Sequence, residues 1–344
     1  MKNTKKVNKN ETAQHEIAQR GEEGSVDNGE REYLKDIIFT VAYYNALDYC
    51  PTTFFVWKHL LSVKRKSERI SPAKVVEGLD FLKKQKKVYF KNGFWRVSGA
   101  VNRDWKRGVI YKHQIQKNKI STDKIKQAKR WSDRLGWLPY LEGLMLTGTL
   151  AMKRGGTDSD WDVLVVMKKD RIWLGRFVLS IWLNFVRKRR FGKYIRDRFC
   201  LNQFMVEDRL EFQERNEFAA NEILASQQLL GQQNIKNKLI EENKKWIKRF
   251  KPNFKFRRVQ SKLIVSRFQM FIKSFLEKFL EMILRAEFLN KVLKKIMIKK
   301  INNNPKTYIE EADIRYSDFF LVFLPHPQRD VVRAKTYNFL TKKC

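Results

Sequence analysis

Two aspartates, one residue apart, stand at the start of an apolar run, in the segment "SDWDVLVVM" that begins at residue 159. Side chains of a β-strand point alternately to its two faces, so Asp160 and Asp162 project from the same side of the strand that this run predicts. Two carboxylates placed in this way repel each other unless a cation neutralises them. Because Mg²⁺ prefers carboxylate and phosphate oxygens, the pair predicts a site for Mg²⁺ or Mn²⁺.

A glycine-threonine turn precedes the aspartates and suits a phosphate-bearing ligand. Gly148 lets the backbone approach a phosphate closely, and Thr149 offers a hydroxyl and an N–H to a β- or γ-phosphate oxygen. We expect Arg154 or Lys153 to screen the charge of a triphosphate, and Ser159, directly before the acidic pair, to join the nucleotide-binding residues. The segment therefore predicts an NTP as a ligand.

This segment resembles the signature of the nucleotidyltransferase superfamily, which includes DNA polymerase β and the aminoglycoside and minimal bacterial nucleotidyltransferases. In that family Gly followed by Gly or Ser stands roughly a dozen residues before an acidic-x-acidic pair. Here Gly148-Thr149 holds the first place and, after ten residues, Asp160-Trp161-Asp162 holds the second. The resemblance implies transfer of an NMP from an NTP to a hydroxyl acceptor, with release of pyrophosphate.

The chain departs from this family at one position. Active members present a third carboxylate from a later strand, which orients or deprotonates the attacking hydroxyl. In "RFCLNQFMVED" Asn202 holds that place, and its amide can ligand a metal weakly but cannot act as a base. Glu207 or Asp208 could substitute, although both follow toward the end of the predicted strand. The alternative function is a non-catalytic nucleic-acid-binding or regulatory protein that retains a degenerate nucleotidyltransferase fold.

The composition is strongly basic, with 72 Lys+Arg against 37 Asp+Glu among 344 residues and a formal net charge of +35. Such a charge favours nucleic acid or nucleotides as partners, although a lysine-rich composition without such a partner is the alternative. Cys50, Cys200 and Cys344 match no metal-ligand spacing and predict a reducing, cytoplasmic location. No run is long and uncharged enough to predict a transmembrane span.

The order of predicted elements indicates an α+β fold with a winged helix at the N-terminus. Residues 1–30 are polar and predict a disordered tail. Residues 31–100 predict three helices, the third beginning at Ser71-Pro72, and a hairpin around Asn92-Gly93. This order is similar to that of winged-helix domains, whose third helix recognises nucleic acid in those that bind it. Most of residues 31–250 resembles bacterial nucleotidyltransferase-domain proteins with a winged helix in front.

The remainder divides into a linker, a core and a helical region. Residues 101–135 predict a basic helical linker. Residues 136–210 predict the nucleotidyltransferase core, a polymerase-β-like mixed sheet with helices. Residues 211–344 show little strand signal and predict a mostly helical C-terminal domain. Within it, the run 267–300 also fits an interfacial membrane helix, although we favour a packed helix.

The helix predicted after the acidic pair carries both an apolar stripe and a basic end. Trp173, Phe177, Ile181 and Phe185 recur at helical spacing and predict the face that packs on the sheet. The basic stretch 187–198, "RKRRFGKYIRDR", points toward nucleic acid as acceptor or tether. Small hydroxylated compounds and the side chains of a partner protein remain acceptors that the superfamily resemblance also implies.

Overall fold

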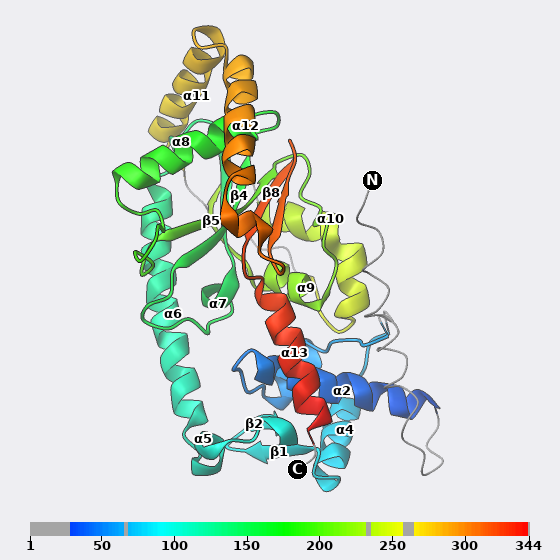
Figure 1. The fold of residues 1–344 in the computed structure, drawn as a ribbon. Helices are drawn as coiled ribbons and strands as arrows, with labels where there is room; N and C mark the ends of the chain where they lie inside the picture. Colours follow the sequence, from blue (N-terminus) through cyan, green and yellow to red (C-terminus); the bar gives the residue numbers. More distant parts are fainter. Residues whose placement is uncertain (1–27, 65–67, 232–234, 257–264, 343–344) are drawn as a thin grey trace.

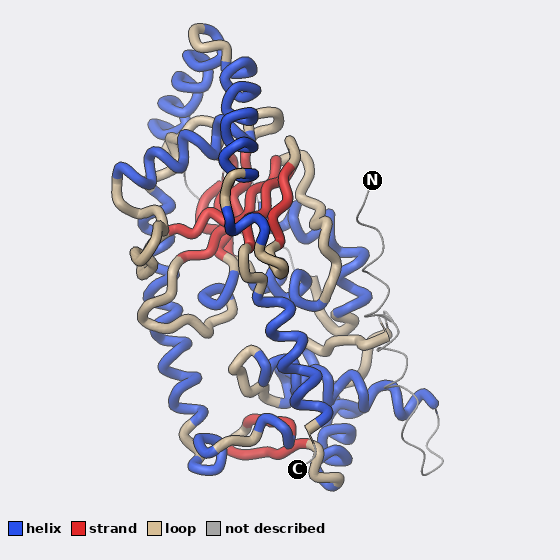
Figure 2. The backbone as a smooth tube through the Cα atoms, in the orientation of Figure 1, coloured by secondary structure: helices blue, strands red, loops and turns tan. Residues whose placement is uncertain are grey.

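The computed structural model describes residues 28–64, 68–231, 235–256 and 265–342. Within these ranges the protein is a mixed α+β structure, with a six-stranded sheet in the order β6-β3-β4-β5-β8-β7 and a separate β1-β2 hairpin (Figures 1 and 2). The strands are β1 (Val88–Lys91), β2 (Phe94–Val97), β3 (Leu141–Leu146), β4 (Trp161–Met167), β5 (Phe199–Val206), β6 (Gln227–Gly231), β7 (Asp313–Tyr316) and β8 (Phe320–Leu324). The tail expected at residues 1–30 lies outside the described residues as far as residue 27.

Helices surround the sheet and form most of the N-terminal unit. The α-helices are α2 (Asn28–Ala46), α3 (Thr53–Lys58), α4 (Pro72–Lys84), α5 (Arg103–Arg107), α6 (Ile110–Asp133), α7 (Gly148–Ala151), α8 (Ile172–Phe185), α9 (Glu217–Ala225), α10 (Ile235–Phe250), α11 (Arg267–Met282), α12 (Ala286–Asn302) and α13 (Gln328–Thr341). Two short 3₁₀ turns are η1 (Ser98–Ala100) and η2 (Pro305–Tyr308). Within the described parts, none of the helices combines the length and the apolar character that a membrane crossing needs.

The N-terminal unit has the element order that the sequence predicts, with α2, α3 and α4 followed by the β1-β2 hairpin. The Ser71 side chain accepts the N–H of Lys74 and caps α4, whose first residue is Pro72. Asn92 and Gly93 have φ of 51° and 86°, as the two central residues of a tight hairpin turn require. Local sequence signals therefore locate these elements correctly.

The end of the chain returns to this unit. Helix α13 packs along α2, and Figure 1 shows it running from the sheet down to the N-terminal helices. Its backbone comes so close to η1 that a Cβ on Gly99 would lie 2.3 Å from the carbonyl oxygen of Phe339. The partly buried Phe339 and Leu340 pack against the core of the N-terminal unit. No local sequence signal predicts this long-range contact.

The sheet places different residues of β4 in two separate cores. Val163 and Val165 lie in a core shared with α6, α8 and α12, whereas Leu164 and Val166 lie in a core shared with α9 and α10. Strand β4 runs antiparallel to β3 and parallel to β5, and α8 lies between β4 and β5 in the sequence. Because strand side chains alternate, Asp162 shares the face of Leu164 and Val166, which is covered by α9 and α10.

The region 211–344 is mostly helical, as the sequence predicts, but it also contributes three short strands that the sequence pattern does not predict. Strand β6 pairs antiparallel with β3, and the β7-β8 hairpin joins the opposite side of the sheet through β5. Short strands at or near the edge of a sheet have weak sequence signals: β6 begins with two glutamines, and β8 ends beside the loop at residues 325–327. The sheet is therefore completed by residues distant from its core in the sequence.

The prediction for the apolar face of α8 is also wrong beyond its first residue. Trp173 is buried, but Phe177, Ile181 and Phe185 are exposed. Residues four apart shift by about 40° around a helix that has 3.6 residues per turn, so a stripe with that spacing moves away from the buried face with each step. Leu179 is among the residues that complete the buried face.

Candidate functional site

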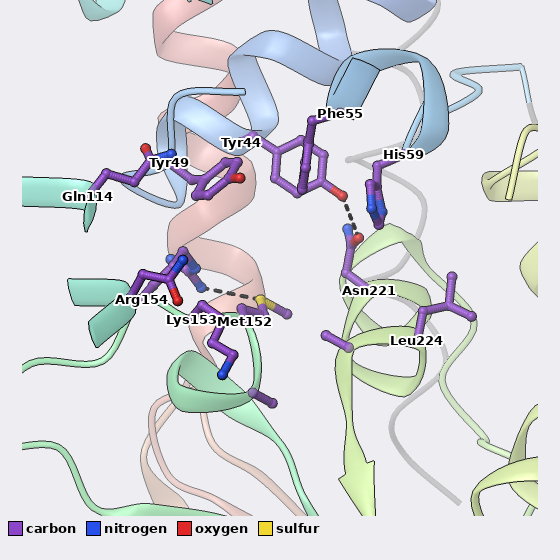
Figure 3. A pocket seen from close by; sticks show the side chains of 13 residues that line it. Tyr44, Tyr49, Phe55, His59, Gln114, Met152, Lys153, Arg154, Asn221 and Leu224 are labelled. Atoms are coloured by element: carbon purple, nitrogen blue, oxygen red, sulfur yellow. Dashed lines mark hydrogen bonds between the residues drawn. The ribbon is translucent and has the colours of Figure 1, made fainter. Parts of the chain in front are cut away.

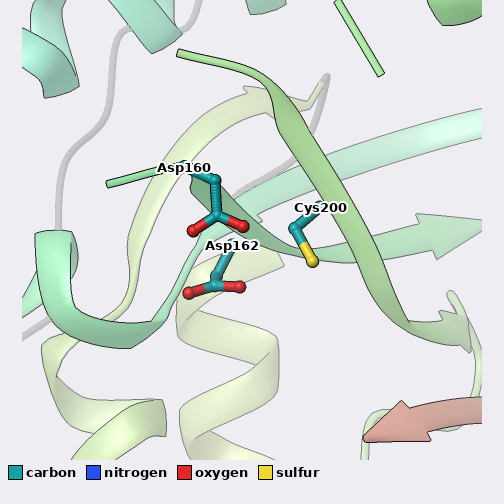
Figure 4. A group of neighbouring side chains, drawn as sticks. All are labelled: Asp160, Asp162 and Cys200. Carbon is teal, nitrogen blue, oxygen red and sulfur yellow. The ribbon is translucent and has the colours of Figure 1, made fainter. Parts of the chain in front are cut away.

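The two aspartates meet a cysteine from the neighbouring strand. Asp160 stands directly before β4, Asp162 lies in β4, and Cys200 is the partner of Asp162 in the parallel strand β5. The ligand atoms of these three residues lie within 4.8 Å of one another. Figure 4 shows both carboxylates on the same side of β4, as the alternation of strand side chains predicts.

Burial and mutual repulsion control the charge of this cluster. Burial, with the charge of Asp160 as the next cause, raises the pKa of Asp162 to about 7. Arg190 donates a hydrogen bond of 2.7 Å from Nη1 to Oδ2 of Asp160, which keeps that carboxylate paired with a cation. Burial, followed by the charges of the two aspartates, raises the pKa of the Cys200 thiol to about 12. Cys200 is therefore a neutral thiol at physiological pH and a poor ligand for a hard cation.

The side chain of Asn202, on β5, also contacts the acidic pair. Its Nδ2 donates to Oδ1 of Asp162 over 3.2 Å, so the amide lies against the acidic pair. Its Oδ1 is buried and has no hydrogen-bond partner within the described residues. Buried amide oxygens are rarely left without a partner, and a divalent cation is one partner that satisfies them. Two carboxylates and one amide oxygen are hard donors of the kind that Mg²⁺ and Mn²⁺ prefer.

Gly148 lies directly against Asp162. It has φ of 66°, and a Cβ at this position would lie 2.5 Å from Oδ2 of Asp162. The neighbouring Thr147 donates its N–H to the Asp162 carbonyl over 2.9 Å, which fixes the turn against β4. Thr149, next along α7, is exposed. Both the backbone conformation and the space therefore require glycine at this position.

A further carboxylate from α9 belongs to this site and was missed by sequence reasoning. Glu222 accepts a backbone hydrogen bond from Gly148. Burial, with the charge of Asp162 as the next cause, raises the pKa of Glu222 to about 8. Its position in the helical segment "EFAANEILA" has no fixed spacing from the aspartates, so no motif could identify it. Glu222 stabilises the turn that carries Gly148.

The structure does not place Arg154 against the acidic pair. Its side chain lies at a cavity of about 280 Å³ whose lining comes from α2, α3, α6, α9 and the segment after α7 (Figure 3). One Nη donates to the carbonyl of Leu47, and the other lies 3.4 Å from the sulfur of Met152. At the same cavity, the Tyr44 hydroxyl donates to Oδ1 of Asn221. Arg154 therefore ties the core to the N-terminal unit.

Ser159 and Lys153 also make contacts within the protein. The Ser159 hydroxyl accepts the N–H of Gly156 over 2.9 Å and closes the turn before β4. The ammonium group of Lys153 donates to the hydroxyl of Thr122 on α6 over 3.1 Å. These two residues position the loop between α7 and β4.

Neither Glu207 nor Asp208 reaches the acidic pair. Strand β5 runs parallel to β4 from the Asp162–Cys200 pair to the Met167–Val206 pair, so Glu207 follows the opposite end of the strand. Its backbone N–H donates to Met167. Asp208 forms an ion pair of 3.3 Å with Lys169. The suggestion that one of these acids replaces the third carboxylate is therefore wrong, because about five strand positions separate them from the site.

Comparisons with known proteins identify no relative of this chain. No protein-family model matches the chain, and neither a curated protein nor a solved structure matches it.

Proposed function

We propose that this protein is a metal-dependent nucleotidyltransferase whose site comprises Asp160, Asp162, Asn202 and the Gly148 turn. The observation that carries the proposal is the close approach of Gly148, a glycine with positive φ that precedes the exposed Thr149, to Asp162 of the acidic pair. A strand, a short glycine-threonine helix and an acidic strand follow one another in β3, α7 and β4. This order supports the resemblance to the polymerase-β-like core.

The proposed reaction is attack by an acceptor hydroxyl on the α-phosphorus of an NTP. The new bond joins the acceptor oxygen to that phosphorus, and the hydroxyl proton passes to solvent water. The bond to the β-phosphate oxygen breaks, and pyrophosphate leaves with its electron pair. Asp160, Asp162 and the Asn202 amide oxygen are the residues that would hold Mg²⁺ or Mn²⁺, which supplies positive charge for the phosphate oxygens. The N–H and hydroxyl of Thr149 bind the triphosphate.

Nucleic acid is the acceptor or tether that the charge distribution favours. The N-terminal unit has the element order of a winged helix, and Lys74, Lys83 and Lys84 are exposed on α4. Near the acidic pair, the basic loop 187–198 includes Arg190 and exposes the aromatic side chains of Phe191 and Tyr194. Cationic loops with exposed aromatic rings bind single-stranded nucleic acid through phosphate contacts and base stacking.

Asn202 also supports a second candidate function. A neutral amide cannot accept a proton from an acceptor hydroxyl, and the nearby Glu222 is committed to the Gly148 turn. A protein with this site could bind nucleic acid without turnover. The Asp160→Asn, Asp162→Asn double variant separates the two functions, because it removes turnover in the first case and leaves or strengthens nucleic-acid binding in the second.

The test is label transfer by the purified full chain. The protein is incubated with each α-labelled NTP, Mg²⁺ or Mn²⁺ and a pool of RNA, protein and metabolites. We expect the wild type to transfer label and the double variant not to, with nuclease or protease sensitivity identifying the acceptor class. Binding of nucleic acid without any transfer would replace the proposed enzyme with the second candidate.

A further inference from the structure

Helix α11 is amphipathic in the opposite sense from an ordinary surface helix. Its charged residues Lys273, Glu277 and Glu281 recur every four positions and face the body of the protein. Lys273, the only buried residue of this helix, donates to Glu142 and to the carbonyl of Leu141, both over 2.8 Å. A helix that only packed on a core would bury apolar side chains on that face and expose the charged ones.

The two glutamates extend this polar contact. Glu277 accepts a hydrogen bond from Lys168 over 2.9 Å and another from the backbone N–H of Tyr140. Glu281 accepts two hydrogen bonds of 2.8 Å from the guanidinium of Arg171. Ion pairs and hydrogen bonds therefore hold one side of α11 against the start of β3 and the segment after β4.

The opposite side of α11 carries large apolar side chains into solvent. Their positions follow helical spacing of three and four residues, so they share one face, which we call the aromatic face. Its members are Phe268 (70% exposed), Phe271 (68%), Phe275 (61%), Phe279 (41%) and Met282 (80%). Aromatic side chains exposed together at this extent on a soluble surface indicate an interaction site.

The turn from α11 to α12 continues this apolar surface. Ile283 and Leu284 are exposed in the turn, and Phe288 is exposed in the first turns of α12. Figure 1 shows the two helices projecting from the end of the molecule that is opposite to α2 and α4. The apolar residues are thus at a protruding tip, where a flat surface can reach them without contacting the rest of the molecule.

The charge of α11 and α12 indicates which kind of partner surface the exposed apolar residues would contact. Residues 267–302 contain nine basic and three acidic residues, and each of the three acidic residues has a basic partner within 4.0 Å. Lys278 and Arg285 are exposed near the tip and have no ion pair within the described residues. If the α11–α12 segments of two copies met, like charges would come together. An anionic bilayer neutralises these charges and accepts aromatic side chains.

We propose that the aromatic face of α11 and the turn to α12 bind the surface of an anionic lipid bilayer. The phenylalanines enter the boundary between headgroups and acyl chains, and the basic side chains contact lipid phosphates. The ion pairs on the other side of α11 keep the helix attached to the protein during binding. This inference concerns the location of the protein and does not depend on nucleotidyl transfer.

The test is flotation of the full chain with vesicles of phosphatidylcholine mixed with phosphatidylglycerol, and with vesicles of phosphatidylcholine alone. We expect flotation with the anionic vesicles at low salt, and weaker flotation with the neutral vesicles. Phe271→Gln and Phe275→Gln should each weaken partitioning about tenfold. Phe54→Gln is the matched control, because Phe54 on α3 is 64% exposed and should leave flotation unchanged.

Three results would overturn the proposal. The wild type could fail to float with the anionic vesicles, or Phe271→Gln and Phe275→Gln could float as well as the wild type. Alternatively, light scattering could show a dimer that Phe275→Gln dissociates, which would assign the aromatic face to a second copy of the chain. Thermal unfolding of each variant checks that the exposed substitutions leave the fold intact.

Discussion

Gly148 and Asp162 approach each other so closely that a Cβ on the glycine would lie 2.5 Å from Oδ2 of the aspartate. Gly148 also has φ of 66°, which side chains disfavour. Gly148→Ala should therefore move the turn away from Asp162, reduce nucleotidyl transfer by about a hundredfold or more, and lower the free energy of unfolding by about 1 kcal/mol or more. Initial rates and thermal unfolding measure these two effects.

The loop between α7 and β4 supplies the control for that prediction. A Cβ at Gly156 would meet no atom within 4 Å, and the residue does not have a positive φ. Gly156→Ala should leave both rate and stability close to those of the wild type. Equal losses from the two substitutions would show that the loop tolerates no change, and the specific role of Gly148 would be rejected.

Asn202→Asp tests whether this position is the missing third carboxylate. The new charge would lie beside Asp162, which accepts a hydrogen bond from the side-chain amide of Asn202 in the wild type. We expect the variant to be less stable without metal by about 1 kcal/mol or more, and to gain more stability than the wild type from Mg²⁺ or Mn²⁺. In the proposed enzyme the transfer rate should also rise, because a base becomes available.

Thermal unfolding with and without metal gives the first two results, and label transfer gives the third. Asn184→Asp is the control, since it adds the same charge at an exposed position on α8. If metal stabilised Asn202→Asp no more than it stabilises this control, Asn202 would not face the metal site.

Lys251 gives a pH dependence whose sign can be stated. Its ammonium group is fully buried and donates to the Tyr44 hydroxyl over 2.8 Å, and burial lowers its pKa from 10.5 to about 7. The unfolded state therefore binds more protons than the folded state between these two values, so the Lys251 contribution to stability rises with pH across that interval. We expect a rise of roughly 1–3 kcal/mol from this residue.

Lys251→Met should remove this contribution and flatten the increase of unfolding free energy between pH 7 and 10.5. Lys236, whose pKa is also lowered to about 7 by burial, keeps part of the increase in the variant. Denaturant unfolding across the interval makes the comparison, with the exposed Lys248→Met as the control. Curves for Lys251→Met and wild type that stay parallel would contradict the assignment.

Sequence patterns located the elements whose signals are local. The Ser71 cap, the Asn92-Gly93 turn and the apolar strand after Asp162 were all interpreted correctly. The edge strand β6 and the packing of α13 on α2 were not predicted, because tertiary contacts create them. The secondary-structure propensities of single residues carry little information about such contacts.

The candidate site divides in the same way. Strand alternation placed Asp160 and Asp162 together, and the family resemblance pointed to Asn202, which contacts Asp162. Glu222 could not be found, since the packing of α9 under the sheet brings it to Gly148. Arg154 or Lys153 was expected to screen the triphosphate, but Arg154 donates to Leu47 and Lys153 to Thr122.

The most direct test of the central claim is calorimetric titration of the full chain with each NTP in the presence of Mg²⁺, because it requires no acceptor. We predict that the wild type binds at least one Mg²⁺–NTP, that Asp158→Asn binds it equally, and that Asp160→Asn with Asp162→Asn does not. Asp158 is the matched control, since it is exposed in the same loop. Unchanged binding in the double variant, or no binding of any NTP by the wild type, would contradict the account.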